Sequence, residues 1–142
     1  MNKIIFSENC NLSSYTTIKV GGVAEYFAEP RSIEELSYLI EWANLNKQRC
    51  QIIGAGSNLL INNIFIKGLV VCTKKMKSLR IEPNTGIVEA EAGVMLPTLS
   101  NSLAKNGLQG GEWAVGIPGT LGGAIYMNAG TVSYTHLTLP TI

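Results

Sequence analysis

The sequence predicts a fold that mixes helices and strands. Three observations support this: a helix pattern followed by two strand patterns, a later antiparallel hairpin pattern, and two glycine-rich segments that carry almost no charge. At 142 residues the chain is long enough for one domain with a substantial core.

A capping box predicts that the first helix begins at Ile33, because Ser32 is a good N-cap and Glu35 follows it three residues later. We expect this helix to run to Asn46. Its apolar positions recur at the spacing of one helical face. These positions are Ile33, Leu36, Ile40 and Ala43.

Two strands are predicted after this helix, a short buried one at residues 49–53 and a second at residues 68–73. The order helix, strand, loop, strand favours an α/β unit. From residue 79 onward, apolar and acidic residues alternate on both sides of a turn at residues 83–86, which predicts an antiparallel hairpin.

A second helix is predicted at residues 98–106, leading into the glycine-rich stretch. Pro97 suits the first helical position, and Gly107 suits the position just past the end.

The composition excludes several classes of function. The net charge is +1, and one small basic cluster (Lys74, Lys75, Lys77, Arg80) is typical of a solvated face, so we expect no nucleic-acid partner. The three cysteines form no CxxC pair, which predicts reduced thiols and no metal site. With no secretory signal and no membrane-spanning run, we expect a cytoplasmic protein without a membrane partner.

The first glycine loop, residues 54–59, lies between two apolar runs and carries no charge. Its backbone N–H groups could form an anion-binding concavity, to which Ser57 and Asn58 add side-chain hydrogen bonds. It is not a Rossmann fingerprint, because Leu59 replaces the third glycine, and it lacks the lysine of a Walker loop. The alternative is an ordinary connection between two strands.

The second glycine loop, residues 116–124, lies in a stretch (107–130) that holds eight of the 15 glycines and a single charged residue, Glu112. Pro118 fixes a turn, and Thr120 adds a hydroxyl to glycines that permit close backbone approach. We interpret Glu112 as a loop carboxylate rather than a catalytic acid. The alternative is a series of tight turns in a barrel rim.

Four motifs in this order resemble the UDP-N-acetylenolpyruvoylglucosamine reductase family, over about residues 11–131. They are TTIKVGGVA (16–24), IGAGSNLL (53–60), GIPGTLGGA (116–124) and YMNAG (126–130). The resemblance implies an α+β fold: an FAD-binding domain of the vanillyl-alcohol oxidase (PCMH) type, holding FAD non-covalently in a cleft between two α+β subdomains, here truncated before the substrate domain.

The resemblance also implies which residues approach the cofactor. The first loop would wrap the pyrophosphate, the second would approach the diphosphate and the flavin, and residues 128–130 would line the same cleft. The implied cofactor-binding residues are Gly54, Ala55, Gly56, Ser57, Asn58, Leu59, Gly116, Ile117, Pro118, Gly119, Thr120, Gly122, Gly123, Ala124, Asn128, Ala129 and Gly130.

The implied reaction uses NADPH to reduce the flavin, which then reduces a UDP-sugar enolpyruvyl ether in peptidoglycan synthesis. The catalytic arginine, serine and glutamate of the family have no counterpart here, so this chain alone is expected to be inactive. The predicted organisation is a lead-in (1–14), a first FAD-binding subdomain (15–75), the start of a second (76–131), and a non-native tail (132–142).

The tail is predicted to be non-native because VSYTHLTLPT is similar to a translated sequencing-adapter end. The one histidine of the chain, His136, lies in it and is given no role. Two alternatives remain open: another PCMH-type flavin oxidoreductase, many of which anchor flavin on histidine, and a non-catalytic nucleotide-binding module.

Overall fold

The computed structural model describes residues 6–62 and 64–130. The chain divides into two compact units, residues 1–76 and 77–142. The predicted boundary between subdomains, after residue 75, lies one residue before this division. The predicted tail at 132–142 and its His136 lie outside the described residues.

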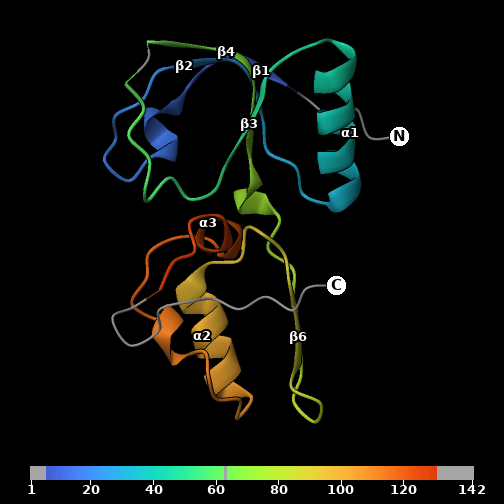
Figure 1. Ribbon diagram of the computed structural model, residues 1–142, viewed down its shortest axis with the longest axis vertical. Helices are drawn as coiled ribbons and strands as arrows, with labels where there is room; N and C mark the ends of the chain where they lie inside the picture. The colour runs from blue at the N-terminus through green and yellow to red at the C-terminus, as the bar shows by residue number, and fades with distance from the viewer. Residues whose placement is uncertain (1–5, 63, 131–142) are drawn as a thin grey trace. The chain divides into compact units, whose positions relative to one another are not determined.

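The first unit is built on a four-stranded sheet of order β1-β2-β4-β3 (Figure 1). Strand β1 (Ser7–Asn11) is antiparallel to β2 (Val23–Ala28), whereas β2, β4 (Phe65–Cys72) and β3 (Cys50–Ile53) are parallel. The segments that follow β2, β3 and β4 therefore all leave the same edge of the sheet, which we call the carboxyl edge.

Strand β4 is the centre of this unit, with apolar side chains covered on both faces. Leu69 and Val71 belong to the cluster under helix α1 (Ile33–Leu45), while Val70 and Cys72 belong to the cluster on the opposite face. Burial on both faces accounts for the nearly continuous apolar sequence of β4. The predicted strand at 68–73 is confirmed, and it begins three residues earlier.

Helix α1 begins as the capping box predicts. The Ser32 side chain accepts a hydrogen bond from the Glu35 amide at 3.3 Å, and the Glu35 carboxylate accepts one from the Arg31 amide at 2.7 Å. The predicted apolar face was partly wrong, since Ile33 is 63% exposed. Leu39 and Ala43 are the buried residues of the helix, because the face against β4 is rotated away from the predicted one.

Strand β3 is present, but the prediction that it is buried was wrong. It forms an edge of the sheet, and three of its four residues are exposed, with only Ile53 buried. The connection from β3 to β4, residues 54–64, joins two parallel neighbours, so it must cross from one end of the sheet to the other. Its described residues, 54–62 and 64, form no helix, and Ile61 packs against the cluster that contains Cys72.

The second unit contains the predicted hairpin, formed by β5 (Leu79–Glu82) and β6 (Ile87–Ala90) in antiparallel register. Helix α2 (Leu96–Lys105) follows, with Pro97 in its first turn and Gly107 just past its end. A short helix α3 (Leu121–Tyr126), absent from the sequence prediction, follows a 3₁₀ turn at Glu112–Ala114. The core of this unit is centred on Leu96, Ala114 and Ala124.

Candidate functional site

The first glycine loop leaves the carboxyl edge directly after β3. In open sheets with parallel strands, ligands characteristically bind at this edge, just beyond the strand ends. The structure therefore places the loop where a ligand is expected from topology alone. No residue of this loop carries a charge, so its backbone groups are the candidate ligand contacts.

Gly56 is the residue that fixes the shape of the loop. It is buried, with φ of +68°, and a β-carbon added to it would collide with the Tyr15 carbonyl oxygen and lie 2.9 Å from the Thr16 α-carbon. Both the left-handed backbone and the close approach require glycine at this position. The loop is thus pressed against the turn that follows the 3₁₀ segment at Leu12–Tyr15.

Three carbonyl groups of the loop region are held by donors from the same unit. The Ile53 carbonyl accepts from the Thr73 hydroxyl at 3.3 Å, and the Gly54 carbonyl accepts from the Cys72 thiol at 3.6 Å. The Gly56 carbonyl accepts from the Thr17 amide at 3.1 Å and from the Thr17 hydroxyl at 3.5 Å. The donors come from two places that flank the loop, the end of β4 and the turn after residue 15.

These bonds set the direction of the amide groups. Across a trans peptide the carbonyl and the next N–H point in opposite directions, and the described residues contain no cis bond. With the Ile53 and Gly54 carbonyls turned toward β4 and its end, the N–H groups of Gly54 and Ala55 point away from it. The loop therefore presents the N–H groups of Gly54 and Ala55 on the side facing away from the Thr73 hydroxyl and the Cys72 thiol.

The backbone of Tyr15 lies against this loop at Gly56, and its aromatic ring packs against Phe27 at a tilted angle, with ring centroids 4.4 Å apart. Burial raises the pKa of the Tyr15 phenol, and the nearby Glu29 carboxylate and the Cys10 and Cys72 thiols raise it further. The phenol is therefore kept in its protonated, neutral form.

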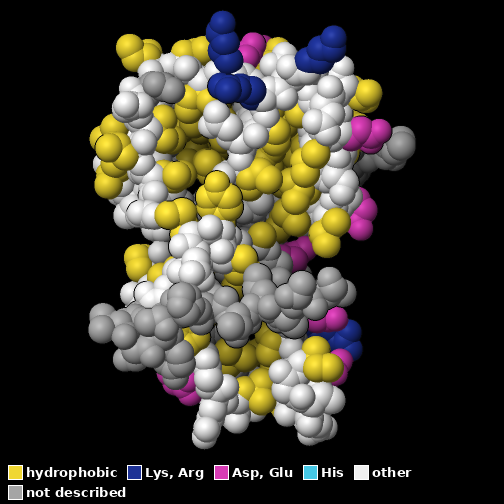
Figure 2. Space-filling view, in the orientation of Figure 1, with side chains coloured by type: hydrophobic (Ala, Val, Ile, Leu, Met, Phe, Trp, Pro, Cys, Tyr) yellow, Lys and Arg dark blue, Asp and Glu magenta, His cyan; other side chains and the backbone are white. Residues whose placement is uncertain are grey.

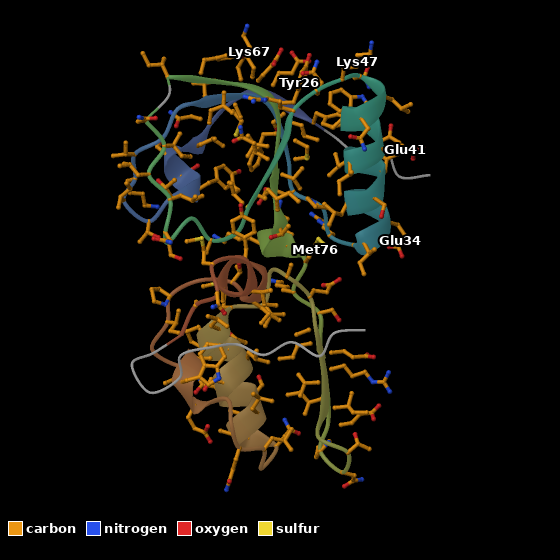
Figure 3. The ribbon with its side chains drawn as sticks, viewed as in Figure 1. Tyr26, Glu34, Glu41, Lys47, Lys67 and Met76 are labelled. Carbon is orange, nitrogen blue, oxygen red and sulfur yellow. The ribbon has the colours of Figure 1, made fainter. Side chains whose placement is uncertain are left out.

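Lysines flank the carboxyl edge even though neither glycine loop contains one. Lys74 and Lys75 directly follow Thr73, and the Lys75 ammonium pairs with the Glu29 carboxylate at 2.7 Å. The labelled Lys47 and Lys67 lie at the other end of the sheet, away from Met76 at the carboxyl edge (Figure 3). Charge at the carboxyl edge is thus supplied by neighbours in space rather than in sequence.

Exposed apolar side chains lie on the chain that continues the first loop and on the adjacent turn. Leu60 is 75% exposed on the connection to β4, and Ile18 is 52% exposed on the turn after residue 15. Hydrophobic side chains are spread over the drawn face of this unit (Figure 2). Such a surface suits a ligand with an apolar body and a polar group.

The second glycine loop is fixed by a different set of bonds, all within the second unit. Gly119 is buried with φ of +145°, and its carbonyl accepts from the Leu96 amide at 3.0 Å. Thr120 caps helix α3, its hydroxyl accepting from the Gly123 amide at 3.4 Å. By the same peptide geometry, the Thr120 N–H points away from α2. The loop is therefore a turn that leads into a helix and not a series of barrel-rim turns.

The first amides of α3 already have acceptors in the protein. The Leu121 amide donates to the Val94 carbonyl at 2.7 Å, and the Gly122 amide donates to the Ala92 carbonyl at 2.9 Å. A β-carbon at Gly122 would lie 2.8 Å from that of Ala92. Gly122 is therefore required for close packing, and the N-terminus of α3 is occupied by the chain itself.

Residues 128–130 follow α3 through a Schellman motif. The Asn128 amide donates to the Ile125 carbonyl at 3.1 Å, the Ala129 amide donates to the Ala124 carbonyl at 2.8 Å, and Asn128 has φ of +48°. Ala129 packs on the cluster that contains Ala124 and Ile117. The structure thus brings the predicted residues 116–124 and 128–130 together in one part of the second unit.

Other potential chemistry in the described residues is limited. The Glu112 carboxylate accepts from the Gly110 amide at 2.9 Å, in agreement with its interpretation as a loop carboxylate. No group of three or more His, Cys, Asp or Glu in residues 6–62 and 64–130 is placed to hold a metal ion. Among the helices of the same residues, none has the length and apolar character needed to span a bilayer.

Comparison with known proteins identifies the family. A family model described as FAD binding domain matches residues 24–137. The chain belongs to this family of FAD binding domains. The two glycine loops both fall inside the matched FAD-binding region.

The curated relatives give a more specific similarity. A UDP-N-acetylenolpyruvoylglucosamine reductase from Prochlorococcus marinus subsp. pastoris (strain CCMP1986 / NIES-2087 / MED4) is 70% identical over 131 residues, covering 92% of this chain and 44% of that protein. One from Prochlorococcus marinus (strain NATL2A) is 55% identical over 130 residues, covering 92% of this chain and 45% of the relative. The chain therefore spans less than half the length of these relatives.

Solved structures agree with this FAD-binding fold. The crystal structure of UDP-N-acetylenolpyruvylglucosamine reductase from Thermus caldophilus matches with a TM-score of 0.74 and 30% identity, covering 92% of this chain and 45% of that one. An alkyldihydroxyacetonephosphate synthase matches with a TM-score of 0.64 and 21% identity, which shows the shared fold alone. The predicted α+β, PCMH-type fold and the predicted family resemblance are both confirmed.

Sequence reasoning missed the residues that hold the first loop in place. Thr17 lies within a motif that carried the family resemblance, but nothing in the pattern gave it a role. Thr73 was predicted only as the end of a strand. Their partnership with the loop depends on strand pairing and on the turn after residue 15, which local patterns do not specify.

Proposed function

We propose that this chain is the FAD-binding part of a reductase that uses NADPH to convert UDP-N-acetylglucosamine enolpyruvate to UDP-N-acetylmuramate. The observation that carries the proposal is the 70% identity to a UDP-N-acetylenolpyruvoylglucosamine reductase over 92% of this chain. The substrate is a UDP-sugar small molecule, the FAD is held non-covalently, and the enzyme acts in the cytoplasm. No catalytic residue is assigned to the chain.

The residues present fit an FAD pyrophosphate. Outward-facing N–H groups at Gly54 and Ala55 are suited to bind phosphate oxygens. The exposed apolar side chains nearby suit the non-phosphate parts of a dinucleotide. When bound, the FAD would supply hydride transfer, and the chain would supply orientation and preorganised dipoles.

In this proposal the predicted site residues have different tasks. Residues 54–59 bind the pyrophosphate through the backbone, and Ser57 and Asn58 add side-chain contacts. In the second unit, Gly116, Ile117, Pro118, Gly119 and Thr120 approach the cofactor with the turn. Gly122 and Gly123 are not proposed as backbone donors, since their amides have acceptors in the chain. Together with Ala124 they leave room for the cofactor because their side chains are small or absent. Asn128, Ala129 and Gly130 extend the same surface.

A chimaera tests the proposal directly. The matched 131 residues of this chain replace the corresponding segment of the Prochlorococcus relative that is 70% identical, and the unmodified relative is the control. We expect the chimaera to be purified with bound flavin and to oxidise NADPH in the presence of UDP-N-acetylglucosamine enolpyruvate. NADH in place of NADPH tests the choice of reductant.

The outcomes separate the levels of the proposal. A folded chimaera that retains no flavin, beside a control that does, contradicts FAD binding by this chain. A flavin-loaded chimaera that NADPH bleaches but the UDP-sugar does not reoxidise contradicts the substrate. A flavin inert to both nicotinamides contradicts the reductase assignment and favours a nucleotide-binding module.

A further inference from the structure

The first glycine loop cannot set its own conformation, because it lies between residues from two other parts of the unit. Its carbonyl groups at Ile53 and Gly56 are bonded to residues 20 and 39 positions away along the chain. Glycine and alanine at 54–56 bring little intrinsic preference for one backbone conformation. The directions of the loop's N–H groups must therefore be imposed from outside.

We propose that Thr73 and Thr17 are positioning residues that hold the first loop ready for a pyrophosphate. Thr73 holds the Ile53 carbonyl inside the unit and so turns the Gly54 N–H outward, and Thr17 holds the Gly56 carbonyl at the other end of the turn. The Cys72 thiol holds the Gly54 carbonyl between them and so turns the Ala55 N–H outward. The inference rests on the proposed function for the identity of the ligand. It goes beyond that function by assigning roles to two residues outside the loop.

Of the two threonines, Thr73 is the better candidate to test by substitution. It is 5% exposed, its bond to Ile53 is buried, and it sits at the end of β4 where the sheet meets the loop. Thr17 holds Gly56 through both its amide and its hydroxyl, so a side-chain change there removes only the longer, 3.5 Å bond. The Thr73 hydroxyl is thus the contact that a substitution can delete cleanly.

The test compares Thr73→Val, which is close to isosteric but lacks the hydroxyl, with Thr73→Ser, which keeps it. Thr98→Val, at an exposed position of α2, is the matched control. The first readout is the backbone order parameter of Gly54 and Ala55 by ¹⁵N relaxation, on the 142-residue chain without ligand. The second is the dissociation constant for FAD, measured on the chimaera described above, with riboflavin as the probe that lacks the pyrophosphate.

We expect Thr73→Val to lower the Gly54 and Ala55 order parameters from about 0.85 toward 0.6, with Thr73→Ser and the control unchanged. We expect its Kd for FAD to rise about fivefold, the equivalent of one hydrogen bond of about 1 kcal/mol, without a change for riboflavin. A merely structural role would instead lower the melting temperature and weaken both ligands equally.

The outcomes decide the proposal whichever way they fall. Unchanged order parameters in Thr73→Val overturn it, whatever the ligand data show. Mobile amides with an unchanged Kd for FAD overturn the link to the pyrophosphate. If the chimaera with wild-type Thr73 binds no FAD, the proposed function fails, while the relaxation data still decide whether Thr73 holds the loop.

Discussion

Replacing Gly56 by alanine should destabilise the first unit by more than its backbone angle alone explains. At φ of +68°, an L-residue costs about 1–2 kcal/mol. The added β-carbon would also collide with the Tyr15 carbonyl oxygen and lie 2.9 Å from the Thr16 α-carbon, and relief of such overpacking costs about 1–3 kcal/mol. The lower entropy of the unfolded alanine chain offsets about 0.4–1 kcal/mol. We expect a net loss of about 1–5 kcal/mol.

Gly107→Ala is the matched control. Its φ of +71° is nearly the same, but a β-carbon there would meet nothing within 4 Å. Without the overpacking cost, the backbone cost and the unfolded-state offset leave a net loss of about 0–1.6 kcal/mol. The difference between the two variants therefore isolates the contact of the first loop with the turn at Tyr15 and Thr16.

Hydrogen exchange with segment resolution is the suitable assay, because the two glycines lie in different units. Peptides from β4 report the opening free energy of the first unit, and peptides from α2 report that of the second. Equal losses in the two variants, within about 0.5 kcal/mol, would refute the reasoning. They would mean that the loop moves away from Tyr15 at little cost.

Four further predictions follow from local contacts. Ser32→Ala should cost about 1 kcal/mol by removing the α1 cap, measured by urea unfolding followed by circular dichroism. Iodoacetamide should modify exposed Cys50 well before buried Cys72, as mass spectrometry of timed samples would show. Burial raises the pKa of the Cys72 thiol above its ordinary 9.0. The free energy of unfolding should therefore keep its full value below pH 9.0 and fall as the pH rises toward the folded-state pKa. If the urea midpoint of Cys72→Ala has the same pH profile as that of the unchanged protein, this prediction is contradicted. Glu25→Ala should cost about 1–3 kcal/mol, because the Glu25 carboxylate accepts from the Gly68 amide at 2.8 Å, and Glu25→Gln should restore most of it in the same unfolding assay.

The sequence predicted those elements whose signals are local. The cap at Ser32, the terminator at Gly107 and the alternating hairpin at 79–90 are each set by a few neighbouring residues, and each is present in the structure. The strand at 68–73 was found because burial on both faces leaves an apolar run that needs no periodicity.

The missed elements depend on contacts that are distant in sequence. Strand β2 contains Glu25 in an otherwise apolar stretch, and that carboxylate is accommodated only because the Gly68 amide lies beside it. Strand β3 looked buried from its composition, but its place at the sheet edge follows from strand order, which no local pattern specifies. Helix α3 was missed because glycines at 122 and 123 disfavour helix, and packing of Gly122 against Ala92 overrides that propensity.

The candidate site shows the same division between local and distant information. Its composition drew attention to two glycine-rich loops, since glycine and lack of charge are visible in the sequence. What makes the first loop suited to an anion is the direction of its Gly54 and Ala55 N–H groups, and that direction follows from bonds to Thr73 and Cys72 outside the loop. The loop itself contains no lysine, but Lys74 and Lys75 lie at the same carboxyl edge of the sheet, because β3 pairs with β4 and these two residues follow β4. A glycine-rich segment therefore indicates where a backbone ligand site lies, while the residues that prepare it are found only through the sheet on which it is built.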